Sequence, residues 1–410
     1  LACPVLLYTA ASVLRLGRPA ALLAAAMGST LWFFDSHIHW LWFVGMVSWA
    51  FASSLSVLTL ALFHRMFEER TGYLVPLCGL SLGVGLLIHP YTFFALAAPI
   101  AVLYGRAFKS LTPRWHGAVL GIAVLVVTMN AFWLHNAARH WHYILNSAFF
   151  AQAHVEFLLC DALDLLCSGA DTGVIGTRTG FRWLYLGLAM AGLWSWRSTR
   201  DRRYLPLVVS LCSLYALAYI GSYIPGLEQT QPYRQLTPAM LVSTLPAASY
   251  VQILFERLSI RALPGSSRAA ALVTVCCLTQ QLVSSQVLYF VPRLIPDTQP
   301  LLDGSPSPLT KYGFWAPPNV ESHPHYGLPH GPTLEQGIAA VTQWVKSNVP
   351  GGSRVLVEGG VLGERLGWTT DVEILGGFTE RNVAHVDANY FRKFQNYAAT
   401  PAQLESYLQT

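Results

Sequence analysis

The sequence predicts an α-helical polytopic membrane protein of about ten spanning helices, with a small C-terminal α/β domain outside the membrane. Three observations predict this fold class: the composition, a series of apolar segments, and a rise in polarity after residue 292. Of the 410 residues, 53% are hydrophobic and only 11% are charged, whereas roughly 25% are charged in an average soluble domain. The mean hydropathy of +0.41 is also that of an apolar chain. These values exclude a soluble enzyme, a disordered chain and a nucleic-acid-binding domain.

Residues 1–292 are expected to form the membrane body. A helix needs about 20 mostly apolar residues to cross a bilayer, and ten segments fit or nearly fit that length. Prolines inside two of them are tolerated, because neighbouring helices in a bundle compensate for the lost hydrogen bonds. The ten segments are 2–16, 19–34, 41–63, 73–88, 90–105, 116–134, 181–196, 204–224, 236–255 and 269–292.

The Lys/Arg distribution orients these segments. One set of alternate loops holds 14 basic residues and the opposite set only four, and loops rich in Lys and Arg are cytoplasmic. The first segment then runs from outside to inside. We therefore expect at least one spanning helix before Leu1, and interpret the chain as an internal piece of a longer protein in an inner or plasma membrane. The basic-rich loops lie around residues 15–18, 65–70, 106–114, 197–203 and 257–268.

The C-terminal tail has the polarity of a soluble segment and is expected on the outer side. Residues 293–332 are rich in Pro, Gly and Ser and predict a linker. Residues 333–410 predict an incomplete α/β domain: helical periodicity covers 333–348, and alternation predicts strands over 354–358 and 373–375.

The loop after the second segment contains the first candidate site. Asp35, His37 and His39 alternate there, so an extended loop would place all three side chains on one side. Carboxylate and imidazole groups are ligands for divalent metal ions. The pattern therefore predicts a metal site for Mg²⁺ or Mn²⁺, ahead of Zn²⁺. The alternative is a polar loop inside a belt of aromatic residues at the membrane interface.

Two other outer loops contain candidate ligand-binding residues. His89 lies between two apolar segments, where an imidazole could bind a phosphate oxygen, or could simply close a tight turn. Glu228, Tyr233 and Arg234 precede the ninth segment. A guanidinium binds phosphate with two parallel hydrogen bonds. We therefore predict that Arg234 contacts a phosphate-bearing ligand rather than only reaching toward lipid headgroups.

The long outer loop, residues 135–180, is expected to begin with an amphipathic helix on the membrane surface. Three acidic residues follow, Asp161, Asp164 and Asp171, and they are expected to be solvated. Cys160 and Cys167 are seven residues apart. In a continuous helix this separation is roughly 10 Å, which is too far for a disulfide.

Several segments resemble one family of membrane enzymes. They are LGRPAALLAAAMGSTLWFF, IHPYTFF, QPYRQLTPAML, QWVKSNVPGGSRVLVEGG and EILGGFTERNVAHVDANYF. Together they resemble the GT-C superfamily of polytopic glycosyltransferases, and within it bacterial pyruvoyl-tetrahydropterin-synthase-related membrane proteins. More distantly they are similar to the catalytic subunit of oligosaccharyltransferase. The tail departs from that subunit because it lacks a WWDYG-like motif.

The resemblance implies a function. GT-C enzymes transfer a sugar from a polyprenyl-phosphate-linked donor to an acceptor on the outer side of the membrane. By analogy, Asp35–His39 corresponds to a loop with metal-binding acids, while Glu228 and Arg234 correspond to a substrate-contacting loop. The main catalytic carboxylate is expected before Leu1. A membrane transporter and a non-catalytic GT-C-like scaffold are the alternatives.

Overall fold

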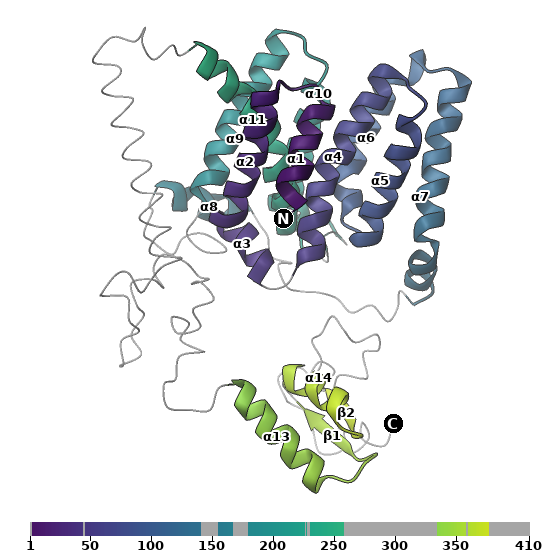
Figure 1. Ribbon diagram of the computed structural model, residues 1–410, viewed down its shortest axis with the longest axis vertical. Coiled ribbons are helices and arrows are strands. Elements are labelled where there is room, and N and C mark those ends of the chain that lie inside the picture. Colours follow the sequence, from purple (N-terminus) through teal and green to yellow (C-terminus); the bar gives the residue numbers. More distant parts are fainter. Residues whose placement is uncertain are drawn as a thin grey trace. The chain divides into compact units, whose positions relative to one another are not determined.

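The computed structural model describes residues 2–43, 46–140, 155–166, 179–225, 227, 230–257, 334–357 and 360–376. These residues are mostly helical (Figure 1). The chain divides into two compact units, which are treated separately below. One comprises residues 1–132 and 150–324, and the other comprises residues 133–149 and 325–410.

The first unit is a helical bundle (Figure 1). Its α-helices are α1 (Ala2–Val13), α2 (Arg18–Phe34), α3 (Ser36–Phe43), α4 (Val47–Glu69), α5 (Leu74–Ile88), α6 (Thr92–Ala107), α7 (Pro113–Arg139) up to residue 132, α8 (Val155–Leu166), α9 (Gly180–Ser198), α10 (Tyr204–Ile220) and α11 (Leu236–Arg257). Short 3₁₀ helices follow α6, follow α10 and precede α11; they are η1 (Phe108–Ser110), η3 (Gly221–Tyr223) and η5 (Pro232–Gln235).

Two helices make up the centre of this bundle. Helix α11 packs against α9, α2, α10 and α4, and α4 packs against α1, α5 and α6. The contact between α9 and α11 is so close that a Cβ atom at Gly192 would lie 2.1 Å from the carbonyl oxygen of Pro246. Membrane helices approach each other in this way where small residues expose the backbone.

Helix α5 packs closely against α7, also at small residues. Gly79 and Gly83 are four residues apart, and a Cβ atom at either position would clash with a side chain of α7, 2.8 Å from Leu125 and 2.6 Å from Met129. The amide of Asn130 on α7 donates to the carbonyl oxygen of Gly83 over 3.1 Å. Small residues at this spacing allow close packing, and a buried polar side chain adds an interhelical hydrogen bond.

Helices lie over nine of the ten predicted apolar segments, and the tenth, 269–292, lies outside the described residues. Four stretches within the described residues are long and apolar enough to cross a membrane: Val47–Glu69, Pro113–Arg139, Tyr204–Tyr223 and Pro232–Arg257. The coarse prediction, a mostly helical protein with helices able to span a membrane, is confirmed. The finer prediction of about ten spans stays a prediction.

The predicted extended loop at Asp35–His39 is wrong. Ser36–Phe43 forms helix α3, because the Asp35 carboxylate caps it: Oδ1 accepts hydrogen bonds from the backbone N–H groups of His37 and Ile38 over 2.9 and 3.1 Å. Asp is among the preferred residues at this position. In a helix, residues two apart do not share a face. His37 therefore does not line up with Asp35 as the metal prediction requires.

Loops predicted to be cytoplasmic meet at one end of the bundle. Arg15, which follows α1, pairs with Glu69 at the end of α4. Arg202, which precedes α10, pairs with Glu68, and Arg203 donates to the backbone oxygen of Leu14 over 3.2 Å. We call this the arginine-rich end. The distribution of basic residues along the sequence therefore corresponds to a grouping in space.

The second unit contains a helix and two strands at the positions predicted in the tail, and the α/β domain itself stays a prediction. Helix α13 (Leu334–Asn348) is followed by β1 (Arg354–Val357), by α14 (Gly360–Thr369), which was not predicted, and by β2 (Glu373–Gly376). The two strands pair in parallel, with Arg354 opposite Glu373. Val345, Val357 and Leu366 form a small apolar core among them. The predicted linker, residues 293–332, lies outside the described residues, as do residues 377–410.

Candidate functional site

A buried arginine holds two buried aspartates together. Arg182 lies in the first turn of α9, and its side chain is 1% exposed. Its Nε and Nη2 atoms donate to the two carboxylate oxygens of Asp35 over 2.9 and 3.0 Å. Its Nη1 atom donates to Oδ2 of Asp161 over 2.8 Å. One guanidinium therefore links the turn before α3 to helix α8.

Two tyrosines complete the arrangement around Asp161. The hydroxyls of Tyr219 on α10 and Tyr233 on η5 donate to Oδ2 of Asp161 over 2.9 and 2.6 Å. Arg182 Nη1 also donates to the Tyr233 hydroxyl over 3.1 Å. We call Asp35, Asp161, Arg182, Tyr219 and Tyr233 the ionic cluster. It connects five elements that are far apart in the sequence.

Two further hydrogen bonds hold the backbone of α8 at Asp161. The indole N–H of Trp183 and the hydroxyl of Thr179 donate to the backbone oxygen of Asp161, over 2.9 and 3.1 Å. Asp161 itself is fully buried. Removing charges from water is costly, and the cost is offset only where geometry and hydrogen bonding are good. The ionic cluster meets that condition with three charge-assisted hydrogen bonds from one guanidinium and two from hydroxyls.

A second group of polar and aromatic side chains adjoins the cluster at η5. The rings of His37 and Tyr233 meet edge to face with centroids 5.0 Å apart. Next along η5, the backbone oxygen of Arg234 accepts a hydrogen bond from the indole of Trp49 over 3.3 Å, and the Trp49 ring lies 4.8 Å from that of His89. Arg234 is 6% exposed. Its charge is thus held in the interior, close enough to act electrostatically on both His37 and His89.

Both histidines are held in the uncharged form. Burial, together with the charges of Arg182 and Arg234, places the pKa of His37 well below its usual range. Burial, reinforced by the charge of Arg234, lowers the pKa of His89 to about 4. An uncharged imidazole beside a guanidinium adds hydrogen-bonding capacity without charge repulsion. The positive charge of this region therefore belongs to the arginines.

Some buried polar atoms nearby have no hydrogen-bond partner among the described residues. Both amide atoms of Gln235 are in this state, as are the hydroxyl oxygens of Ser36 and Thr237. Each of these residues is at most 2% exposed. Buried polar atoms are nearly always hydrogen-bonded, by protein, water or ligand. Gln235 follows Arg234 directly and Ser36 follows Asp35, so these atoms fit a site that receives a polar ligand.

The structure brings together most of the residues predicted to form the site. Asp35, Tyr233 and Arg234 lie in or beside the ionic cluster, with His37 against Tyr233 and His89 against Trp49. His39 lies in α3, and its side chain is outside the described part of the chain. Glu228 is also outside the described residues.

The described residues do not fit a divalent metal ion at Asp35. Its carboxylate accepts two hydrogen bonds from Arg182 and two from the backbone of α3, and the guanidinium would repel a cation. Among the described side chains, no three His, Cys, Asp or Glu residues are grouped as metal ligands. We therefore derive no step through a metal.

Sequence reasoning missed the centre of the site. Asp161 was expected in a solvated loop, and this is wrong: the chain forms α8 there, and Asp161 is fully buried against Arg182. The available signals were a lone acid amid Phe157–Ala162 and a lone Arg182 in an apolar segment. Ionisable residues in such segments mark functional sites by default. Cys167, one partner in the disulfide that was considered, lies outside the described residues.

No protein-family model, curated protein or solved structure matches this chain. The function must therefore be argued from the geometry above.

Proposed function

We propose that this protein is a membrane glycosyltransferase of the GT-C type, acting on the outer side of an inner or plasma membrane with the α/β tail on that same side. It would transfer a sugar from a polyprenyl-phosphate-linked donor to an acceptor. The observation that carries the proposal is the burial of Arg234 on η5, between the two uncharged histidines and the unpartnered amide of Gln235.

The donor has three chemical parts, and this arrangement suits two of them. A polyprenyl chain needs an apolar environment, which lipid-facing helices of the bundle offer. A phosphate needs hydrogen-bond donors and positive charge, and the guanidinium is the side chain best adapted to it. Arg234 lies on η5, two residues before α11 begins, and we assign this end of α11 to the outer side of the membrane.

In the proposed reaction, the bond between the anomeric carbon and the phosphate oxygen breaks while an acceptor oxygen bonds to that carbon. Arg234 stabilises the charge that the leaving phosphate gains. The acceptor proton goes to a base. Asp35 and Asp161 are both bound by Arg182, so we assign them to positioning Tyr233 and Arg234. We do not assign the base to a described residue.

One observation favours the transporter as a second candidate. Buried Asp–Arg networks within membrane bundles also mark ion and proton pathways, and the ionic cluster is such a network. A transporter would use it to bind a coupling ion or proton during alternating access.

Reconstitution separates the two candidates. The purified full chain is placed in liposomes with a radiolabelled polyprenyl-phosphate sugar, and two quantities are measured: sugar released from the lipid, and uptake of labelled solutes and protons. The proposal expects donor-dependent sugar release that Arg234→Ala reduces, while Arg257→Ala, an exposed residue at the other end of α11, does not. Solute or proton uptake without sugar release would instead support the transporter.

A further inference from the structure

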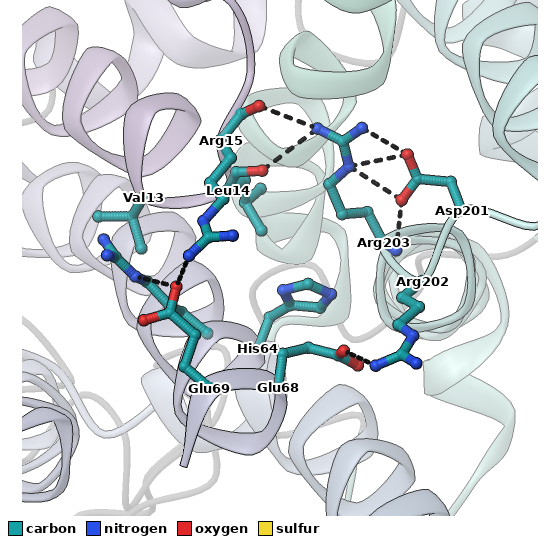
Figure 2. Close-up of a pocket in the computed structure, with 10 residues that line it drawn as sticks. Val13, Leu14, Arg15, His64, Glu68, Glu69, Asp201, Arg202 and Arg203 are labelled. Carbon is teal, nitrogen blue, oxygen red and sulfur yellow. Dashed lines mark hydrogen bonds and ion pairs between the residues drawn. The ribbon is translucent and has the colours of Figure 1, made fainter. Parts of the chain in front are cut away.

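A pocket lies at the arginine-rich end of the bundle, away from the ionic cluster (Figure 2). It forms where the turn after α1, the last turns of α4 and the loop before α10 meet. Its volume is about 320 Å³, at the lower end of the roughly 300–1,000 Å³ typical of small-molecule sites. Arg182 lies 16 residues before the end of α9, which is roughly 24 Å along the helix, and the pocket is lined by residues beyond that end, so it is a separate site.

The lining carries an excess of positive charge. Four arginines and three acidic residues surround the pocket. Glu69 pairs with two arginines, Arg15 and Arg65, whereas Glu68 and Asp201 each pair with one. One positive charge is therefore left over at Glu69. An anion can bind there without leaving a carboxylate uncompensated.

Arg15 is the cation best placed to meet such an anion. Its side chain is 73% exposed, and Arg65 alone can keep Glu69 neutralised at 2.8 Å. Exposed ion pairs are worth about 0–1 kcal/mol, so exchanging Glu69 for a ligand costs little. Arg15 has φ of 58°, in the left-handed region. Arg203 holds this turn by donating to the backbone oxygens of Leu14 and Arg15 over 3.2 and 3.4 Å.

A buried histidine independently points to a ligand. His64 is 8% exposed, and its Nε2 atom has no hydrogen-bond partner among the described residues. Figure 2 shows the imidazole between the Arg15–Glu69 pair and the Asp201–Arg203 pair. A ligand atom in the pocket would satisfy this nitrogen.

We propose that this pocket binds a phosphate group, carried by an anionic lipid of the adjacent leaflet or by free inorganic phosphate. Arg15 and Arg202 supply guanidinium donors at the mouth, and their side chains are 73% and 68% exposed. His64 supplies Nε2 at the floor, and in the uncharged tautomer that carries its proton on Nε2 this nitrogen donates to a phosphate oxygen. Basic pockets between membrane helices on the cytoplasmic side bind lipid phosphates in this way.

The test measures phosphate binding in two arms with the purified full chain. One arm uses nanodiscs of phosphatidylcholine and radiolabelled inorganic phosphate. The other uses nanodiscs that also contain phosphatidylglycerol, and native mass spectrometry counts the lipid retained after release into detergent. We expect Arg15→Ala and His64→Gln each to weaken binding by about tenfold, the loss of one charge-assisted contact. Binding in the lipid arm alone identifies the headgroup as ligand, and binding in the phosphate arm alone identifies free phosphate.

A matched control distinguishes a pocket from general attraction to a basic surface. Arg114 is exposed at the start of α7, beside the loop where Arg70 contacts Ser110, and it does not line the pocket. Arg114→Ala should leave binding unchanged. An equal loss in Arg114→Ala, or no binding by the wild-type chain in either arm, overturns the proposal. Arg202→Gln, at an exposed side chain, repeats the test should His64→Gln fold poorly.

Discussion

Arg182 is the single residue on which the ionic cluster depends most. It is the only described partner that neutralises both Asp35 and Asp161, and all three side chains are at most 1% exposed. Removing one partner of a buried pair typically costs about 3–5 kcal/mol, since the other charge remains buried. The ionic cluster therefore fixes the positions of α3, α8 and η5 relative to α9, and it adds little net stability to the fold.

Arg182→Met should lower the free energy of unfolding by at least about 3 kcal/mol, because it leaves two carboxylates buried without a cation. Unfolding in mixed detergent, followed by tryptophan fluorescence, measures the change. The triple variant Arg182→Met, Asp35→Asn, Asp161→Asn removes all three charges, and Asn still caps α3. It should regain more than half of the loss. A triple variant no more stable than the single one would show that uncompensated charge is not the cause.

His89 predicts a pH dependence of stability. Burial and Arg234 lower its pKa from 6.5 to about 4 in the folded chain, so the unfolded state binds a proton first as the pH falls. This contribution to stability is fully present above pH 6.5, and it is lost progressively toward pH 4. The wild-type melting temperature should fall across this window more steeply than that of His89→Gln. Parallel curves for the two proteins would contradict it.

Site residues were predicted correctly where the side-chain type alone, such as a carboxylate or a guanidinium between apolar segments, indicates a binding role. Asp35, His37, Tyr233 and Arg234 stand between apolar segments of the sequence, in loops predicted to be outer, and the structure places them close together. No role was predicted for Arg182, which stands at the start of the apolar segment 181–196. Its role depends on partners 147 and 21 residues away, and no local pattern encodes that pairing.

At the scale of elements, the position of α9 controls the site, since α9 carries Arg182. Its depth against α11 is set by Gly192, where a Cβ atom would lie 2.1 Å from a backbone oxygen of Pro246. Backbone cannot move aside as a flexible side chain can. A substitution there must push the two helices apart.

Gly192→Ala should therefore destabilise the protein by about 1–3 kcal/mol, the usual cost of overpacking, and weaken binding of a polyprenyl-phosphate analogue at Arg234, because α9 carries the Arg182 that positions this site. Gly187→Ala on the same helix is the control, because its Cβ atom meets nothing within 4 Å. That change should be neutral or stabilise the helix by up to about 1 kcal/mol. Equal unfolding free energies for the two variants would contradict this account of the contact.

Element-level prediction was strong for helices and weak for what joins them. Apolar length alone predicted the positions of helices such as α4 and α10, and periodicity predicted α13, β1 and β2. It did not predict α3, because a single capping side chain, Asp35, decides that the chain turns into a helix there. Capping depends on side-chain geometry that hydropathy does not contain.

At the scale of the whole molecule, the proposed function requires the ionic cluster to face outward and the arginine-rich end to face the cytoplasm. The Lys/Arg distribution supplies the orientation. The structure adds that the basic loops around Arg15, Glu69 and Arg202 meet at one end of the bundle. A bundle whose two ends were equally basic would have no preferred orientation in the membrane.

Cysteine labelling in intact cells tests this orientation. In a cysteine-free background, a membrane-impermeant maleimide should label Lys346→Cys on α13 and leave Arg200→Cys unlabelled until the membrane is permeabilised. Both positions are exposed, so access to the reagent depends on the side of the membrane. Labelling of position 200 but not of 346 would reverse the orientation and remove the outer site from the donor side.

The most direct test of the central claim is a titration of the purified full chain with a polyprenyl-phosphate analogue. Arg234 on η5 is proposed to hold two phosphate oxygens at once, which Lys cannot match. Arg234→Lys should therefore weaken binding by about tenfold, Arg234→Ala should weaken it more, and Arg257→Ala should leave it unchanged. If Arg234→Lys and Arg234→Ala both bind the analogue as tightly as the wild-type chain, Arg234 does not bind the lipid phosphate, and the glycosyl-donor site is not where we place it.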